Sequence, residues 1–521
     1  MSTSLQYSYL DNSSNLESQP LVMNKHILSK SDFLKFYNCS SYLWFYKNRP
    51  ELLSSKELDP FAERLIEQGK HVESKVRELF PEGRMIHSYK EEAVADTKKL
   101  LEEGCKTIFQ ASFMHDNRYI MCDILVWNEL FQAWDLIEVK SSSSADFSRT
   151  NKHHLYDATF QKIVLEASNM KIANVYLIEL NKEFVKDGDI DLGKLFVQSE
   201  ITTEVLENEE LIKADMEHAM NIINGSQPTE CECKYKGRSK HCEAYAYLYP
   251  KTPAYSVYDF TAIGASKRKL EALVDANVID MNDVNETHDL LPKHKNQWWV
   301  HANNEVILEK EMLQEEFDGL VFPIYFLDYE TLPLAIPYYE GSYPYQQTVI
   351  QYSLHILSED GNIDHKEYIH RDKTSPQKVI AEKLRNDIGD QGSVIVWNKP
   401  FEGKCNSDLA KANPHLSDFL LGVNDRIYDL MEVIKKQKYL HKDFKGKYSI
   451  KNVLPVMCPE LDYSNLSVSN GAQAVNVYES LIFGNYPPEQ KEKAFQELLE
   501  YCELDTWAMV RIYQELVKLI A

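Results

Sequence analysis

The chain of 521 residues lacks the features of several large protein classes. Glycine is scarce (18) while tyrosine is abundant (31), which argues against fibrous and disordered architectures. No stretch approaches 18 consecutive apolar residues, so we expect no membrane span. The N-terminus is polar and has neither a basic region nor an apolar core of the secretory type. We therefore expect a flexible tail over residues 1–24 of a cytoplasmic protein.

The chain also lacks positive charge, since its formal net charge is −23. This balance argues against tight, non-specific coating of duplex DNA. It leaves open a nucleic-acid partner bound through local basic patches, because attraction to phosphate depends on the local charge distribution. Two such patches stand out, "CKYKGRSKHC" and "SKRK", and they contain Lys234, Lys236, Arg238, Lys240, Lys267, Arg268 and Lys269.

A disulfide framework is not expected, because the nine cysteines occur in a chain without a secretory signal. Five of them are scattered and fit the role of small buried apolar residues: Cys105, Cys122, Cys405, Cys458 and Cys502. Cys231, Cys233 and Cys242 are different, because they fall within twelve residues among basic and polar neighbours. Burial in an apolar core does not explain that grouping.

The length predicts about two to four domains. From 25 to 250 the pattern is helix, helix, strands, helix, strand, helix, with paired strands at "RYIMCDILVW" and "AWDLIEVK". Residues 251–320 are mostly short helices, which we interpret as a helical connector with a small helical hairpin at 266–284. From 321 to 521, four strands precede a helix-rich stretch. The sequence thus predicts an α/β protein with two domains.

The first candidate site lies on the paired strands. Glu138 and Lys140 alternate on one strand and share a face, and Asp123 lies on the preceding strand. Two carboxylates can hold Mg²⁺ or Mn²⁺, and a lysine beside them can orient or activate the attacking water. Glu73 on an earlier helix and Gln161 on a later one could complete the pocket. The alternative is an ordinary solvated strand edge, because Glu-x-Lys is common.

The second candidate site combines a later strand with two later helical segments. Asp328 and Glu330 lie two apart on the strand "YFLDYET", while Tyr501 and Asp505 lie four apart on one helical face. The acids of these pairs are of the type needed to hold divalent cations against a phosphodiester. The segment "WNKPFEGK" supplies a further acid, Glu402. Asp429 is a weaker substitute and is better explained as a residue that starts a helix.

The first set resembles the PD-(D/E)XK nucleases, in the branch that contains RecB-type and CRISPR-adaptation exonucleases. The matching residues, in order, are Asp123, Glu138, Lys140 and Gln161. The resemblance implies a restriction-endonuclease-like core. Relatives of that branch often place a metal-binding histidine four residues after a helical glycine. Here Gly69 is followed at that spacing by Glu73, which leaves open whether Glu73 or the nearby His71 serves the site.

The same branch often holds an iron–sulfur cluster with one cysteine before the nuclease core and three after it. The matching cysteines are Cys39, Cys231, Cys233 and Cys242. The resemblance implies a 4Fe–4S cluster, which would staple both ends of the domain together. The Cys-x-Cys spacing is tighter than the usual Cys-x₂-Cys, so zinc remains open, with Cys39 or His241 as the fourth ligand.

The second set resembles the DEDD exonucleases, which have a ribonuclease-H-like fold and bind two metal ions through four acids. The resemblance implies metal ligands at Asp328, Glu330 and Asp505 and a water-orienting hydroxyl at Tyr501. Glu402 stands where that family usually has aspartate. The longer side chain can still reach a metal ion, but the departure puts turnover at this site in question.

Together the two sets resemble a bacterial family that fuses a RecB-like nuclease domain to a DEDD-type domain, and the resemblance covers most of the chain from about residue 25. It implies a metal-dependent nuclease that hydrolyses phosphodiesters at two sites and acts on DNA as single strands or ends. One alternative is an RNA 3′–5′ exonuclease that uses mainly the C-terminal site. Another is a nucleic-acid-binding protein in which one nuclease domain is catalytically silent.

Overall fold

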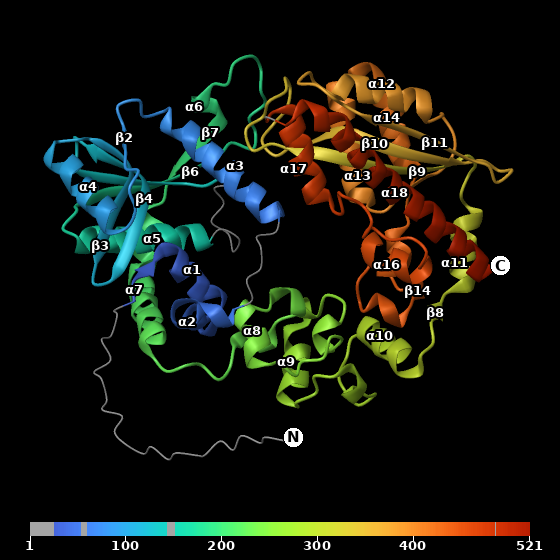
Figure 1. Cartoon of the computed structure of the whole chain (residues 1–521), viewed down its shortest axis with the longest axis horizontal. Helices are drawn as coiled ribbons and strands as arrows, with labels where there is room; N and C mark the ends of the chain where they lie inside the picture. Colours follow the sequence, from blue (N-terminus) through green and yellow to red (C-terminus); the bar gives the residue numbers. More distant parts are fainter. Residues whose placement is uncertain (1–25, 54–59, 143–151, 485) are drawn as a thin grey trace, which may run out of the picture.

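The computed structural model describes residues 26–53, 60–142, 152–484 and 486–521. The tail expected at 1–24 lies outside them. Within the described part the protein is a mixed α/β fold built from two sheet-containing halves and a helical segment between them (Figure 1). None of the described helices is long and apolar enough to cross a membrane.

The N-terminal half is built on a mixed sheet with the order β2-β3-β4-β5-β6-β7, in which β1 pairs parallel with β4. Its strands are β1 (Leu28–Ser29), β2 (Arg84–Met85), β3 (Thr107–His115), β4 (Arg118–Asn128), β5 (Ala133–Val139), β6 (Ile172–Leu180) and β7 (Phe196–Glu200). The antiparallel β4–β5 pair is the predicted pair of strands and is confirmed. Strand β3 has no counterpart among the predicted elements.

Helices cover both faces of this sheet: α1 (Lys30–Asn38), α2 (Ser40–Asn48), α3 (Pro60–Arg77), α4 (Glu91–Glu102), α5 (Lys152–Ala167), α6 (Leu192–Leu195) and α7 (Thr202–Asn224). Phe160 of α5 and Met216 of α7 belong to the core on one face, and Val72 of α3 belongs to the core on the other. Helix α1 begins with a capping box at Ser29. The backbone is extended at Cys39, which separates α1 from α2.

The connector comprises α9 (Lys267–Asp275), α10 (Pro292–Asn303), β8 (Ile307–Leu308) and α11 (Lys310–Asp318), and α8 (Glu243–Leu248) directly precedes it. The first part of the connector has an apolar core that also includes Cys39, Cys231 and Cys233. Phe260 and Leu270 pack around the cysteines, whereas Leu313 and Phe317 join the core of the C-terminal half. The hairpin expected at 266–284 contains one α-helix, α9, followed by a short 3₁₀ turn.

The C-terminal half has a five-stranded sheet with the order β11-β10-β9-β12-β13. The first three strands are antiparallel, and β12 and β13 continue the sheet in parallel with β9. Its strands are β9 (Ile324–Pro333), β10 (Gln347–Leu357), β11 (Ile363–Ile369), β12 (Val394–Val396) and β13 (Ile427–Asp429), and β14 (Tyr439–Leu440) pairs with β8. The four predicted strands are confirmed, while the three-residue β13 was not predicted.

Side chains that alternate along the strands of this sheet pack into two apolar cores, one on each face. Phe326 packs with Met509 of α18, and Leu327 packs with Leu384 and Leu409 of α12 and α13 on the other face. The helices of this half are α12 (Gln377–Asp387), α13 (Lys399–Ala412), α14 (Ser417–Asp425), α15 (Met431–Lys435), α16 (Ile450–Met457), α17 (Gly471–Ile482) and α18 (Pro488–Ile520). Helix α18 thus lies against the face that carries the even-numbered positions of β9.

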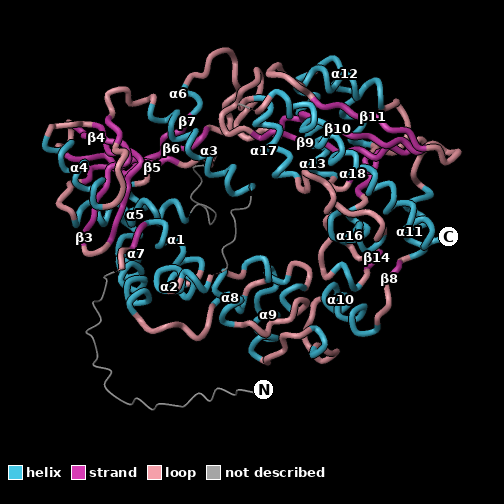
Figure 2. The backbone as a smooth tube through the Cα atoms, in the orientation of Figure 1, coloured by secondary structure: helices cyan, strands magenta, loops and turns pink. Residues whose placement is uncertain are grey.

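The two halves also touch each other directly, and Figure 2 shows α3 running towards α17. Arg64 of α3 forms an ion pair with Glu479 of α17. The side-chain oxygen of Gln68 accepts the backbone N–H of Ala335 at 2.9 Å. Ala335 and Ile336 also join the apolar cluster beneath α3. The halves are therefore held together by this contact as well as by the connector.

Candidate active sites

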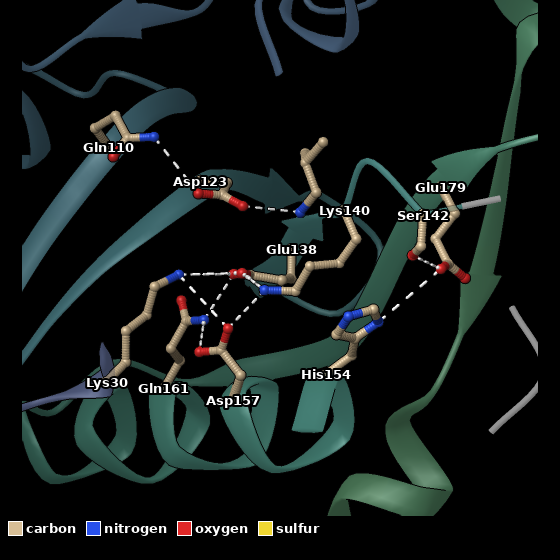
Figure 3. Close-up of polar contacts among 11 residues, drawn as sticks. Lys30, Gln110, Asp123, Glu138, Lys140, Ser142, His154, Asp157, Gln161 and Glu179 are labelled. Atoms are coloured by element: carbon tan, nitrogen blue, oxygen red, sulfur yellow. Dashed lines mark hydrogen bonds and ion pairs between the residues drawn. The ribbon is translucent and has the colours of Figure 1, made fainter. Parts of the chain in front are cut away.

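The first candidate site, called here the N-terminal pocket, is formed by Lys30, Asp123, Glu138, Lys140, Asp157 and Gln161. Figure 3 shows Glu138, from β5, at its centre. The Glu138 carboxylate is 1% exposed and accepts three donors: Lys140 Nζ at 2.5 Å, Gln161 Nε2 at 2.7 Å and Lys30 Nζ at 3.0 Å. Asp123, from β4, accepts the backbone N–H of Val139 at 2.8 Å. The four predicted residues therefore meet at one place.

Two members of the pocket were not predicted. Asp157 lies one turn before Gln161 on α5 and accepts hydrogen bonds from Lys140 Nζ at 2.7 Å and from Gln161 Nε2 at 3.0 Å. The i, i+4 spacing from Gln161 was a signal for it. Lys30 reaches the pocket because the short strand β1, which directly precedes it, pairs with β4. No local pattern marks a lysine 108 residues before the glutamate that it contacts.

The charges of the N-terminal pocket largely balance. Burial opposes ionisation of Glu138, but Lys140 and Lys30 hold its pKa well below the ordinary value. Burial also opposes the charge on Lys140, yet Asp157 and Glu138 raise its pKa. Lys140 thus stays protonated and is suited to orient water or phosphate rather than to accept a proton. Burial and the charge of Glu138 raise the pKa of Asp123 to about 7.

Glu73, rather than His71, approaches this pocket. Gln110 Nε2 donates to Glu73 Oε1 at 2.5 Å and lies 3.5 Å from Asp123 Oδ1, so the amide bridges the two acids. Gln110 has a φ of +56°, a left-handed conformation that is uncommon outside glycine. Arg77 pairs with Glu73 at 2.6 Å. His71 is exposed on α3, so of the two residues Glu73 is the one linked to the pocket.

The second candidate site, called here the C-terminal cluster, consists of Asp328, Glu330, Glu402 and Asp505. Asp328 and Glu330 project from β9 towards α18, which carries Asp505, and carboxylate oxygens of these three residues lie within 4.8 Å of one another. Tyr463 OH donates to Asp505 Oδ1 at 2.6 Å and fixes that side chain. Tyr501 lies one turn before Asp505, as predicted, and its hydroxyl accepts from Lys451 Nζ at 3.0 Å.

Glu402 lies beside the other three members of the cluster, outside the group of three carboxylates within 4.8 Å of one another, and feels the charges of Asp328 and Glu330. It lies in the first turn of α13, is 3% exposed, and its Oε2 has no hydrogen-bond partner among the described residues. Burial and the charges of Asp328 and Glu330 raise its pKa well above the ordinary value. Asp429 instead accepts the backbone N–H groups of Lys399 at 3.0 Å and Met431 at 3.1 Å. It therefore caps α13 and α15, as its predicted role at a helix start requires.

The charges of the C-terminal cluster do not balance. Within the described residues, no lysine, arginine or histidine nitrogen lies within 4.0 Å of its four carboxylates. Burial, reinforced by neighbouring carboxylates, raises the pKa values of Asp328 and Glu330 well above normal, and burial raises that of Asp505 to about 6. Buried like charges with a free carboxylate oxygen are suited to hard divalent cations such as Mg²⁺ and Mn²⁺.

The cysteines predicted to bind a cofactor meet at one point. Cys39 Sγ lies 3.3 Å from Cys231 Sγ and 3.7 Å from Cys242 Sγ, and Cys231 Sγ lies 3.4 Å from Cys242 Sγ. Cys233 completes the group within 4.8 Å. A tetrahedral zinc ion with Zn–S bonds of about 2.3 Å places its sulfurs about 3.8 Å apart. In a 4Fe–4S cluster the four cysteine sulfurs bind different iron atoms of the cube and therefore lie farther apart than around a single ion. The observed separations of the cysteine sulfurs favour one ion.

His241 is directed away from the cysteines. Its Nε2 lies 2.9 Å from the carbonyl oxygen of Lys236, and its ring stacks on Tyr245 with centroids 3.6 Å apart. Cys39 reaches the other three cysteines because the chain is extended between α1 and α2. The structure thus supplies Cys39, not His241, as the fourth candidate ligand.

The two basic patches are largely neutralised within the protein. The ion pairs are Lys234–Glu230, Arg238–Asp259, Lys267–Glu271 and Lys269–Asp289. Arg238 also donates to the carbonyl oxygen of Pro253 and to Ser256 Oγ, so it holds the connector together. Lys240 and Arg268 are exposed. The patches therefore offer a weaker path for phosphates than the sequence indicated.

Comparisons with known proteins place a family match over part of the C-terminal half. A family model described as a domain of unknown function (DUF2779) matches residues 325–449, a segment that includes Asp328, Glu330 and Glu402. No solved structure matches significantly.

Among curated proteins, the chain is 28% identical over 268 residues to the uncharacterized protein UU173 of Ureaplasma parvum, covering 44% of this chain and 37% of the relative. It is 27% identical over 219 residues to the uncharacterized protein MG366 of Mycoplasma genitalium, covering 37% and 32% of the two chains. The aligned part of the chain thus spans about a third of the length of these relatives.

Proposed function

We propose that this chain is a metal-dependent nuclease that hydrolyses phosphodiesters at two sites and acts on DNA as single strands or ends. The observation that carries the proposal is the C-terminal cluster, in which partly or fully buried carboxylates converge and form no ion pair with a cation of the described chain. Such a group is stable only if it is protonated or if it binds cations. Divalent ions held there would activate water and stabilise the charge of an in-line displacement.

The strand orders support the specific folds implied by the resemblances to PD-(D/E)XK nucleases and DEDD exonucleases. In chain order, the C-terminal sheet reads 3-2-1-4-5, with three antiparallel strands followed by two parallel ones. This is the arrangement expected of a ribonuclease-H-like domain. In the N-terminal half, the antiparallel β3-β4-β5 ribbon continues through α5 to the parallel strand β6. We propose a restriction-endonuclease-like core for that half.

In the N-terminal pocket, different side chains can bind the metal ion and stabilise negative charge on the phosphate. Asp123 and Glu138 would hold the metal ion, and Gln161 fixes the orientation of Glu138. Lys140 and Lys30, both held protonated by neighbouring acids, can stabilise the negative charge that develops on the phosphate. Glu73 is a further ligand candidate at the pocket's edge.

In the C-terminal cluster, Asp328, Glu330, Glu402 and Asp505 are the proposed metal ligands. Burial and the charge of Asp505 raise the pKa of Tyr501 far above its ordinary value, so its hydroxyl keeps its proton. Tyr501 therefore positions the attacking water and does not act as a base. Lys451 holds the phenol oxygen from the other side at 3.0 Å.

For the cysteines we propose one zinc ion in a four-sulfur site. It would join the junction of α1 and α2 to the start of the connector, closing a long loop. The protein purified without oxygen should then be colourless and contain zinc that Cys242→Ser loses. A brown protein with iron and sulfide would instead establish the iron–sulfur cluster.

A second candidate function is a nuclease in which only the C-terminal cluster cuts while the N-terminal half binds the strand. The charge balance of the N-terminal pocket favours this possibility, because Lys30 and Lys140 already neutralise much of its negative charge.

The test is digestion of labelled single- and double-stranded DNA and RNA with Mg²⁺ or Mn²⁺, using the wild type, Glu138→Gln, Asp328→Asn and the double variant. We expect DNA to be cut, each single variant to keep one activity, and the double variant to be inactive. If Glu138→Gln cuts every substrate like the wild type, the second candidate replaces the first. If the double variant remains fully active, neither site is catalytic.

A further inference from the structure

A third group of metal-ligand side chains lies outside both candidate sites, on the hairpin formed by β10 and β11. His355 and His365 are directly opposite each other in the antiparallel register, and their rings stack with centroids 4.4 Å apart. Glu503 of α18 approaches them, with its Oε1 3.9 Å from His365 Nδ1. One ligand atom from each of the three residues lies within 4.8 Å of the other two.

A chain of hydroxyl groups defines where the protons of both histidines lie. Thr506 Oγ1 donates to the backbone carbonyl of Glu503 at 3.0 Å, and a carbonyl only accepts. The Thr506 oxygen must then accept from Ser353 Oγ at 2.7 Å and from His355 Nδ1 at 2.9 Å. Because Ser353 has given its proton to Thr506, it accepts from His365 Nε2 at 2.9 Å.

The free lone pairs are therefore His355 Nε2 and His365 Nδ1. Neither atom has a hydrogen-bond partner within the described part of the chain. Histidines that bind metals almost always donate their other ring N–H to a fixed acceptor, which orients the ring. Here both rings already have such an acceptor, which leaves the second nitrogen of each ring free to bind a metal ion.

We infer that His355, His365 and Glu503 bind one transition-metal ion, for which zinc is the best match, with water as the fourth ligand. Imidazole selects transition metals, whereas the all-oxygen C-terminal cluster suits Mg²⁺ or Mn²⁺. Three protein ligands with one open position form a common zinc arrangement. The ion would tie the β10–β11 hairpin to α18 at a position two residues from both Tyr501 and Asp505. The inference does not depend on nuclease activity.

The test is a cobalt titration of the full-length protein, because Co²⁺ can replace zinc and has absorption bands in the visible range. The Asp328→Asn background removes competition from the C-terminal cluster. Cobalt bound to His355 and His365 gives only d–d bands, whereas cobalt bound to the cysteines adds intense thiolate charge-transfer bands. In that background we compare His365→Ala, Glu503→Gln and the control His415→Ala, whose histidine is exposed elsewhere in the same half.

In protein whose four-cysteine site already holds zinc, we expect one equivalent of Co²⁺ with tetrahedral d–d bands in the background protein and in the His415→Ala control. His365→Ala should weaken this binding by more than the ~10–100-fold that follows loss of an outer partner alone. Glu503→Gln should weaken it in the same direction, and its side chain is half exposed, so the fold is retained. Equal binding in His365→Ala, Glu503→Gln and His415→Ala would overturn the inference, as would a background protein that gives no d–d bands.

Discussion

In the N-terminal pocket, Lys30 and Lys140 lie within 3.0 Å of Glu138, whereas no cationic nitrogen of the described chain lies within 4.0 Å of the C-terminal cluster. In both sites carboxylates lose hydration on folding, which costs free energy. The first offsets that cost with lysines supplied by the chain. The second has Lys451 nearby, but its Nζ bonds the Tyr501 hydroxyl and the carbonyl oxygen of Ser469.

This difference indicates how each site depends on metal ions. The N-terminal pocket is assembled before any ion arrives, because its lysines and Gln161 already orient Glu138. In the C-terminal cluster, burial and the neighbouring carboxylates raise the pKa values of Asp328 and Glu402, so protons and cations compete for these groups. A substitution that removes one carboxylate should therefore have opposite effects on stability in the two sites.

The largest expected effect is on catalysis in the C-terminal cluster. Asp328→Asn removes a charged ligand from the centre of the cluster, so we expect its cleavage rate to fall by about 10³-fold or more. The measurement is the rate of strand shortening in Mn²⁺, in a Glu138→Gln background that silences the other site. Asp418→Asn, at an exposed acid of α14, is the matched control. Equal rates for the two variants would remove Asp328 from the active site.

Next in size is the effect of Glu138→Gln on folding. The substitution leaves the partly buried Lys30 and Lys140 without their central carboxylate, and breaking a buried ion pair costs about 3–5 kcal/mol. Urea unfolding of the metal-free protein measures it. Glu129→Gln on the exposed β4–β5 turn should change stability by less than about 0.5 kcal/mol. A Glu138→Gln protein as stable as the wild type would contradict the charge balance proposed for the pocket.

The same change in the C-terminal cluster should have the opposite sign. Glu402→Gln mimics the protonated acid, so we expect it to stabilise the metal-free protein by about 1–2 kcal/mol at pH 8. Because the folded-state pKa of Glu402 is raised, the wild type loses stability as the pH rises above the ordinary pKa of a glutamate. The difference from the wild type should therefore shrink at pH 5. A destabilised Glu402→Gln at pH 8 would show that the cluster is neutralised by other means.

The smallest expected effect concerns Tyr501. Tyr501→Phe removes one hydroxyl that positions water and leaves the ligands in place, so the rate should fall about 2- to 12-fold, the equivalent of one hydrogen bond of about 0.5–1.5 kcal/mol. Single-turnover rates in Mn²⁺ measure it, and Tyr338→Phe at an exposed tyrosine is the control. A loss as large as that of Asp328→Asn would instead make Tyr501 an essential group.

The carboxylates of both sites could be predicted because they follow local periodicity. Glu138 and Lys140, like Asp328 and Glu330, lie two apart on strands with apolar neighbours, and Tyr501 and Asp505 lie four apart on a helix. The α/β class followed from the same alternation of strands and helices.

The residues that neutralise or orient these carboxylates could not be predicted in the same way. Lys30 depends on the pairing of β1 with β4, and Tyr463 reaches Asp505 from a segment without regular structure. The placement of His355 directly across from His365 depends on the register of β10 and β11, which sequence periodicity alone does not determine. Strand β13 is only three residues long, too short for its pattern to differ from that of a helix start.

The most direct test of the central claim is calorimetric titration with Mn²⁺ at pH 6.5 in two buffers with different ionisation enthalpies. If the C-terminal cluster is a metal centre that holds protons in the absence of metal, binding must release protons, because Asp505 and its neighbours ionise as the ions enter. Asp123 of the N-terminal pocket can also release a proton at this pH, so the comparison is made in Glu138→Gln protein. We predict proton release in Glu138→Gln and its loss in the Glu138→Gln, Asp328→Asn double variant. Binding without proton release in Glu138→Gln, or equal release in the double variant, would contradict the account.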